Sequence, residues 1–164
     1  NYFFSQENTS ISASKETEID IYRKRGVQIG TNCAFYNVSI DIIVSSFNKN
    51  RKQFIITHSS LIAHDASTKR ESGYSRVGVI NIGNNIFIGW RCIILGNIHI
   101  GNNVIIGAGS IINKNIPDNS VVAGNPAKVI CTYDYYIQKH KGLFKSSPIS
   151  NIPFSEKNQK DKDS

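Results

Sequence analysis

A repeat of six residues runs without interruption from Ile82 to Pro117, and it limits the folds open to this chain. The six hexads read IGNNIF, IGWRCI, ILGNIH, IGNNVI, IGAGSI and INKNIP, and each begins with isoleucine. Gly stands second in four of them, and the fifth place always holds a small or β-branched residue. An α-helix cannot use this pattern, because a period of six drifts around a helix of about 3.6 residues per turn.

The repeat suits a triangular coil. Each hexad supplies one short strand and one corner, so that three hexads complete a turn of a parallel β-solenoid and the isoleucines stack in columns. An ordinary parallel sheet would need crossover helices between its strands, and the sequence offers none. The recurring Gly and Asn predict corners with positive φ. We therefore predict an all-β solenoid.

Weaker hexads precede the regular ones. They read IGTNCA at 29–34, ITHSSL at 56–61 and IAHDAS at 62–67. The charged, Gly-bearing stretch 68–78 predicts a loop extruded from a coil, and the polar stretch 45–53 predicts a second interruption.

The flanks of the repeat predict other structure. A short helix is expected around Glu16–Arg25, with Ser14 or Thr17 near its start. A second helix after the last coil would cap the solenoid's open end, which otherwise exposes strand edges. The expected division is an N-terminal segment at 1–28, a solenoid domain at 29–130, a capping helix at 131–144 and a mobile tail at 145–164.

Composition narrows the compartment and the partners. The chain has 164 residues and a net charge of +7. The segment 139–164 contains six Lys and three acidic residues, so it contributes +3 of this charge. The remaining charge forms no dense basic block, so nucleic-acid binding is not compelled, whereas a small polyanionic ligand suits these charges. Three scattered cysteines make neither a disulfide framework nor a metal pattern, which favours a reducing cytoplasm. No transmembrane or signal segment is visible, and the absence of Met leads us to expect a short missing N-terminal piece.

The hexads, followed by IGAGSIINKNIPDNSVVAGNPAKVI at 106–130, resemble the hexapeptide-repeat acyltransferases. The likeness covers about residues 25–138 and includes RGVQIGTNC and the AHD segment. It is greatest to bacterial sugar O-acetyltransferases, including galactoside and maltose acetyltransferases and those that modify surface polysaccharides. The resemblance implies a left-handed parallel β-helix, a homotrimer, and acetyl-coenzyme A (acetyl-CoA) bound in a groove between neighbouring solenoids.

The resemblance also implies roles for particular residues. His64 matches the catalytic histidine, and the backbone N–H of Trp90, directly after Gly89, matches the group that faces the thioester carbonyl. The remaining cofactor-binding positions match Ala108, at the pantetheine, and Lys114 and Lys128, near the nucleotide. Two departures stand out: many relatives have Thr-His-Asp-Gly where this chain has AHDA at 63–66, and a usual Pro is replaced by Gly96.

Acyl transfer to a hydroxyl needs a base near neutral pH, which imidazole supplies. We predict that His64 is this base, because Asp65 adjoins it and a polar loop follows. His58 is a weaker candidate, while His99 and His140 have the positions of surface residues. Metal-ligand spacing among histidines and cysteines is absent, so no metal is expected.

Three polar residues are candidates for binding the acceptor. We expect Asp65 to contact a sugar hydroxyl and not to form a tight pair with His64, because the side chains of adjacent residues seldom face each other. Asn37 and Asp41, in FYNVSID, match places where relatives contact the acceptor, and ordinary turn chemistry explains them equally well.

The resulting hypothesis is direct acetyl transfer from acetyl-CoA to a saccharide hydroxyl. His64 would remove the proton, and the Trp90 N–H would stabilise the oxyanion. Two alternatives stay open: N-acetylation of an amino sugar or antibiotic, and a non-catalytic solenoid that serves as a binding module.

Overall fold

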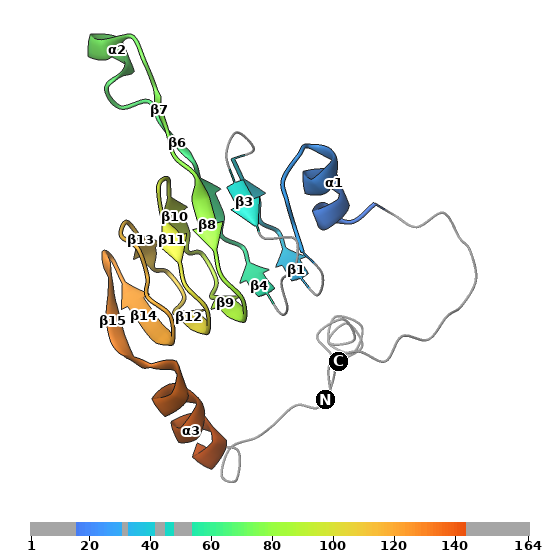
Figure 1. Cartoon of the computed structure of the whole chain (residues 1–164), viewed down its shortest axis with the longest axis vertical. Helices are drawn as coiled ribbons and strands as arrows, with labels where there is room; N and C mark the ends of the chain where they lie inside the picture. The colour runs from blue at the N-terminus through green and yellow to red at the C-terminus, as the bar shows by residue number, and fades with distance from the viewer. Residues whose placement is uncertain (1–15, 31–32, 42–44, 48–53, 144–164) are drawn as a thin grey trace, which may run out of the picture.

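The structure is a computed structural model that describes residues 16–30, 33–41, 45–47 and 54–143. The chain winds through three parallel sheets in turn, as the predicted triangular coil requires (Figure 1). The first sheet contains β1 (Cys33–Tyr36), β4 (Phe54–Thr57), β9 (Ile86–Ile88), β12 (Val104–Ile106) and β14 (Ser120–Gly124). The second contains β2 (Ser39–Ile40), β5 (Ser60–Ile62), β10 (Ile93–Leu95) and β13 (Ile111–Ile112). The third contains β3 (Ser45–Phe47), β8 (Ile80–Ile82) and β11 (His99–Ile100).

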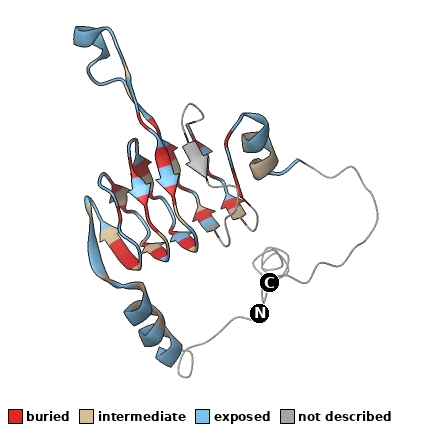
Figure 2. Cartoon of the chain, in the orientation of Figure 1, coloured by how far each residue is buried: buried red, intermediate tan, exposed pale blue. Residues whose placement is uncertain are grey.

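Successive coils stack in register. Ile88 pairs with Ile106, Ile94 with Ile112 and Ile82 with Ile100 across parallel neighbours. The isoleucines at the first hexad places are completely buried, and Figure 2 shows the buried residues following the strands of the solenoid. The predicted isoleucine columns are therefore confirmed.

We call the turn from the first sheet to the second the first corner, the turn from the second to the third the second corner, and the turn from the third to the first the third corner. The prediction of positive φ is right for the Asn places and wrong for the repeated Gly. Positive φ falls on fourth hexad places, such as Asn85 and Asn103. Gly83, a second-place glycine, instead allows coils to approach, because a Cβ there would lie 2.1 Å from the Gly101 carbonyl oxygen.

The hexad frame that we predicted for residues 56–67 is wrong. Leu61, rather than Ile62, pairs with Ile94 and is buried, whereas Ile62 is exposed. Leu61 comes five positions after the inward Ile56, whereas a hexad requires six, so the first corner of this coil is one residue shorter than a hexad allows. The expected interruption at 45–53 also needs correction, because Ser45–Phe47 pairs with β8 as a regular strand, while 48–53 lies outside the described residues.

An arm leaves the solenoid at the second corner and begins earlier than the predicted 68. It consists of the antiparallel strands β6 (His64–Asp65) and β7 (Arg76–Val77) with the short helix α2 (Lys69–Ser72) between them, and it projects well beyond the coils (Figure 1). The Gly78 N–H donates to the Ala63 carbonyl at 2.7 Å, so the arm leaves and re-enters at one point.

Elements outside the repeat lie at both ends of the stack. At the first coil, α1 (Glu18–Lys24) packs against β1, and the Tyr22 hydroxyl donates to the Val38 carbonyl and accepts from the Ile40 N–H. Thr17 caps α1 by accepting from the Asp20 N–H. At the last coil, β15 (Ala127–Thr132) pairs antiparallel with β14 and covers its edge. The helix α3 (Tyr133–Leu143) follows β15 and buries none of its residues.

Within these described ranges, the helices are all too short or too polar to cross a membrane.

Candidate functional site

His64 and Asp41 meet at the second corner. Asp41 follows β2 and His64 follows β5, which is the adjacent strand of the second sheet. The Nδ1 atom of His64 lies against Oδ2 of Asp41, and the His64 side chain is 51% exposed while that of Asp41 is 16% exposed. An ionised carboxylate only accepts hydrogen bonds, so the ring proton of neutral His64 stands on Nδ1. This leaves the Nε2 lone pair available as a base.

Asp65 is turned away from His64 into the arm. Its carboxylate accepts from the Ser67 N–H at 2.9 Å and from the Arg76 guanidinium at 2.9 Å. The hydrogen bonds from Ser67, followed by the one from Arg76, lower the pKa of Asp65 to about 2. Asp65 therefore stays ionised and helps to close the base of the arm, and the residue that contacts the imidazole is Asp41.

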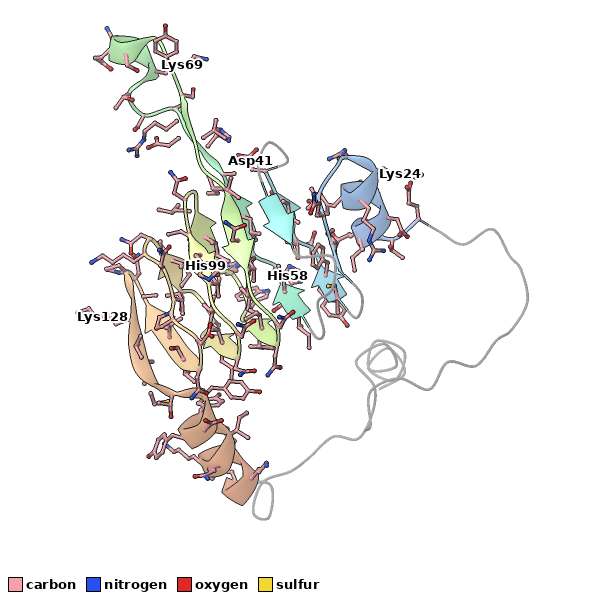
Figure 3. The ribbon with its side chains drawn as sticks, in the orientation of Figure 1. Lys24, Asp41, His58, Lys69, His99 and Lys128 are labelled. Atoms are coloured by element: carbon pink, nitrogen blue, oxygen red, sulfur yellow. The ribbon has the colours of Figure 1, made fainter. Side chains whose placement is uncertain are left out.

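His58 occupies the first corner of the same coil, and Figure 3 shows it well apart from Asp41. Its Nδ1 lies 3.3 Å from the amide nitrogen of Asn37, which can only donate, so Nδ1 accepts and the ring proton of neutral His58 stands on Nε2. Neutral His58 therefore has no free lone pair to act as a base, because Nδ1 accepts from Asn37 and Nε2 carries the proton. The structure thus places Asn37 beside His58 and not beside His64.

Trp90 follows in the next coil at the first corner. Trp90 is 48% exposed, its ring meets that of His58 edge to face at 6.0 Å, and the Arg91 guanidinium carbon lies 4.2 Å from the indole centroid. Arg91 has φ 56, a left-handed conformation that is unusual for a long side chain. This cation–π contact was not predicted from the sequence, because Arg91 stands at a place that Asn fills in the two flanking hexads.

Gly89 and Ala108 belong to the first corners of adjacent coils. A Cβ on Gly89 would lie 2.7 Å from the Ala108 nitrogen, so only glycine lets the coils approach here. Among the described residues, neither the Trp90 N–H nor the Ala108 N–H donates a hydrogen bond. Two backbone donors are thus available for a ligand along this corner.

The two predicted cofactor lysines lie apart from each other. Lys128 stands on β15 opposite Ala123, and the adjacent Gly124 N–H donates to Ser110 at the first corner. Lys114 follows β13 and so belongs to the second corner. The structure therefore gathers Gly89, Trp90, Ala108 and Lys128 along one corner column, whereas Lys114 joins the column of His64.

His64 and Trp90 also stand at different corners of one prism. The second sheet separates them, since β10 begins after Trp90 and the adjacent β5 ends before His64. The three residues of β10 alone span about 10 Å. One copy of the chain therefore does not bring His64, the predicted base, and the Trp90 N–H to a single acetyl group.

Among the described residues, no group of three or more His, Cys, Asp or Glu side chains is arranged to hold a metal ion. The cysteines there are free, and burial raises the pKa of the Cys92 thiol.

Comparison with known proteins identifies the architecture and its chemistry. No protein-family model matches the chain. Protein CapG of Staphylococcus aureus is 39% identical over 127 residues, which cover 73% of this chain and 74% of CapG. A maltose O-acetyltransferase from Clostridium difficile 630 is 26% identical in sequence and superposes with a TM-score of 0.56 over 76% of this chain and 79% of its own. This chain belongs to the hexapeptide-repeat acyltransferases.

A further solved structure shares the fold of this acyltransferase. The polySia-specific acetyltransferase NeuO superposes with a TM-score of 0.56 at 24% identity, over 65% of this chain and 52% of NeuO. The expected left-handed parallel β-helix is confirmed, as is the expected class of enzyme, an acetyltransferase.

Proposed function

We propose that this acetyltransferase moves the acetyl group of acetyl-CoA to a saccharide hydroxyl, with His64 as the general base. The observation that carries the proposal is the His64–Asp41 pair, which leaves a basic Nε2 at an exposed position where the arm begins. The named activity of the maltose O-acetyltransferase supports a sugar acceptor. A surface-polysaccharide precursor is the acceptor that we infer, and NeuO, named for polySia, is consistent with it.

The proposed reaction is direct transfer. Nε2 of His64 takes the hydroxyl proton as the acceptor oxygen attacks the thioester carbon. The Trp90 N–H stabilises the negative charge that develops on the carbonyl oxygen. The carbon–sulfur bond then breaks, and the imidazolium returns its proton to the departing thiolate. Asp41 stabilises that imidazolium during the interval.

The cofactor would follow the first corner. The N–H groups of Trp90 and Ala108 would bind the thioester and the pantetheine, and Lys128 would meet the phosphates. Lys114, at the second corner, would reach the nucleotide of a cofactor held mainly by a neighbouring chain. The acceptor would bind near His64, with Asp65 and the arm forming its wall and Asn37 contributing only if a second copy presents it.

We further propose a homotrimer in which adjacent copies share each site. The separation of His64 from Trp90 on one chain supports this assembly. Two outer faces of the prism are apolar: the second sheet exposes Ile62 and Leu95, and the first exposes Ile55 and Phe87. The third sheet instead presents Asn81 and His99. Two apolar faces suit packing between copies.

Two further expectations belong to this proposal. We propose a solenoid domain at 29–130. An N-terminal segment at 1–28 precedes it, and a capping helix at 131–144 and a tail at 145–164 follow it. The reaction is placed in the cytoplasm, which the free cysteines of the described residues favour.

The test is acceptor profiling with isotopically labelled acetyl-CoA. The purified protein is incubated with matched hydroxy sugars and amino sugars, and products are identified by mass spectrometry before and after mild alkali. An alkali-labile acetyl group on a hydroxy sugar is expected, because esters hydrolyse under conditions that amides survive. Exclusive formation of alkali-stable product would establish N-acetylation instead.

A further inference from the structure

A buried hydroxyl lies directly behind the Trp90 corner. Ser59 is 1% exposed, and its Oγ lies 2.9 Å from the Gly89 carbonyl oxygen and 2.8 Å from that of Thr57. The Cys92 N–H donates to the same Oγ at 3.0 Å. The single hydroxyl proton of Ser59 is therefore directed at backbone carbonyls, one of them in the next coil.

The Gly89 carbonyl and the Trp90 N–H are two halves of one peptide group. This peptide is trans, since the cis bond of the described chain is Asn125–Pro126. In a trans peptide the C=O and N–H bonds point in opposite directions. A carbonyl held by the buried Ser59 hydroxyl consequently turns the N–H outward, to the side on which Trp90 is exposed.

The next coil repeats the arrangement with different atoms. The Gly107 carbonyl accepts from the Cys92 thiol at 3.2 Å and from the Ser110 hydroxyl. This carbonyl shares its peptide with the Ala108 N–H, which is thereby turned outward as well. In each case a donor from the preceding coil reaches the carbonyl: the Ser59 hydroxyl reaches Gly89, and the Cys92 thiol reaches Gly107. A thiol is a weaker donor than a hydroxyl, so the Gly89–Trp90 peptide has the stronger of the two contacts.

The fold itself does not require a hydroxyl at this place. Register places Val38 of the first coil at the same corner position as Ser59, and Val38 is also buried. An apolar β-branched side chain therefore fits this column.

We propose that Ser59 is a positioning residue for acetyl transfer, which holds the Gly89–Trp90 peptide so that its N–H meets the thioester oxygen. A hydrogen bond to the carbonyl also polarises the amide and strengthens its N–H as a donor. Ser59 touches no reacting atom and exchanges no proton with substrate. This inference rests on the proposed function, because it requires the thioester to bind at this corner.

The test compares two isosteric variants, Ser59→Thr and Ser59→Val. Both side chains have the shape that Val38 shows to be tolerated, and they differ in the hydroxyl alone. The first readout is the infrared carbonyl frequency of acetyl-CoA labelled with ¹³C at the thioester carbonyl, measured bound and free. A lower frequency is expected on the wild type and on Ser59→Thr, because a hydrogen bond weakens the C=O bond. Most of that lowering should be lost on Ser59→Val.

The second readout is kinetic. Loss of an oxyanion donor costs about 10²–10³ in kcat, so a misaimed donor in Ser59→Val should lower kcat about tenfold or more relative to Ser59→Thr. KM for acetyl-CoA should remain within about twofold, since most cofactor contacts persist. Ser120→Ala is the matched control, because that buried hydroxyl donates to the Asp118 carbonyl two residues earlier, at the third corner. It should leave the carbonyl frequency unchanged.

The possible results separate this inference from the proposed function. Equal carbonyl frequencies and equal kcat in Ser59→Thr and Ser59→Val, with both proteins folded, would overturn the role of Ser59 alone. Failure of the wild type to bind acetyl-CoA in calorimetry would overturn the proposed function, and this inference with it.

Discussion

The hydrogen-bond partners of two histidines give different tautomers to the proposed base, His64, and to His58. His64 has Nδ1 against a carboxylate and keeps Nε2 for the substrate, whereas His58 has Nδ1 against an amide nitrogen. From the sequence, we preferred His64 over His58 as the base only because Asp65 and a polar loop follow it. The contacts now supply a chemical reason for preferring His64.

Replacement of His64 tests this choice. His64→Ala should lower kcat about 10²–10⁴-fold, the usual contribution of a positioned acid–base group. KM for acetyl-CoA should change little, because the imidazole meets the acceptor. Steady-state kinetics with an acceptor found by profiling provide the measurement, with His58→Ala as the control that retains most activity. Full activity in His64→Ala, together with loss in His58→Ala, would reverse the assignment.

Asp41 has a separate consequence. Asp41→Asn should lower kcat about tenfold or more at neutral pH, because an amide neither stabilises an imidazolium nor fixes the tautomer. Asp65→Asn is the comparison, since Asp65 bonds to Ser67 and Arg76 instead. Equal losses of kcat in the two variants would show that the carboxylates act through the arm and not through the imidazole.

At the scale of the coil, stacking glycines are predicted to be less tolerant than helical ones. Gly83→Ala places a methyl group 2.1 Å from the Gly101 carbonyl oxygen, so it should cost about 1–3 kcal/mol or more through overpacking. Gly142→Ala in α3 meets nothing within 4 Å and should be neutral or stabilising. Thermal unfolding followed by circular dichroism measures both. Equal melting temperatures would refute the close approach between coils.

The sequence predicted the elements whose spacing never varies. Isoleucine at the first place of every hexad predicts stacked isoleucines, so both the isoleucine columns and the fold class could be predicted from the repeat. The corner between Ile56 and Leu61 escaped prediction because one missing residue shifts the frame of everything after it. The strand Ser45–Phe47 escaped because it begins a polar stretch, and its pairing depends on β8, more than thirty residues later.

The candidate site was only partly predictable for the same reason. His64 was found from its local motif, and Asp41 was chosen as an acceptor contact. Their meeting depends on which residues of β2 and β5 pair, and that register is invisible until the short corners are known. Ser59 was not a candidate from the sequence, because its proposed role depends on a carbonyl 30 residues away in the chain.

At the scale of the whole molecule, the proposed trimer makes a specific prediction. Light scattering should give three times the chain mass of 18.2 kDa. Mixing His64→Ala with Lys128→Ala, after unfolding and refolding together, should restore activity above the sum of the two at low acetyl-CoA. If adjacent chains share each site, a mixed assembly contains sites in which His64 of one chain faces Lys128 of its neighbour, and both of these residues are intact. Activity equal to the sum, or a monomer with full turnover, would contradict sharing.

The single point at which the arm leaves the solenoid has an evolutionary consequence. Because Ala63 and Gly78 are joined by one backbone hydrogen bond, the coil closes beneath the arm as though the intervening residues were absent. Insertions at such a junction cost little, since closing a longer loop adds only a slowly rising entropy. Natural selection is then free to lengthen, shorten or exchange the part of the arm beyond His64 and Asp65 while the proposed base is kept, so the choice of acceptor can diversify faster than the chemistry it serves.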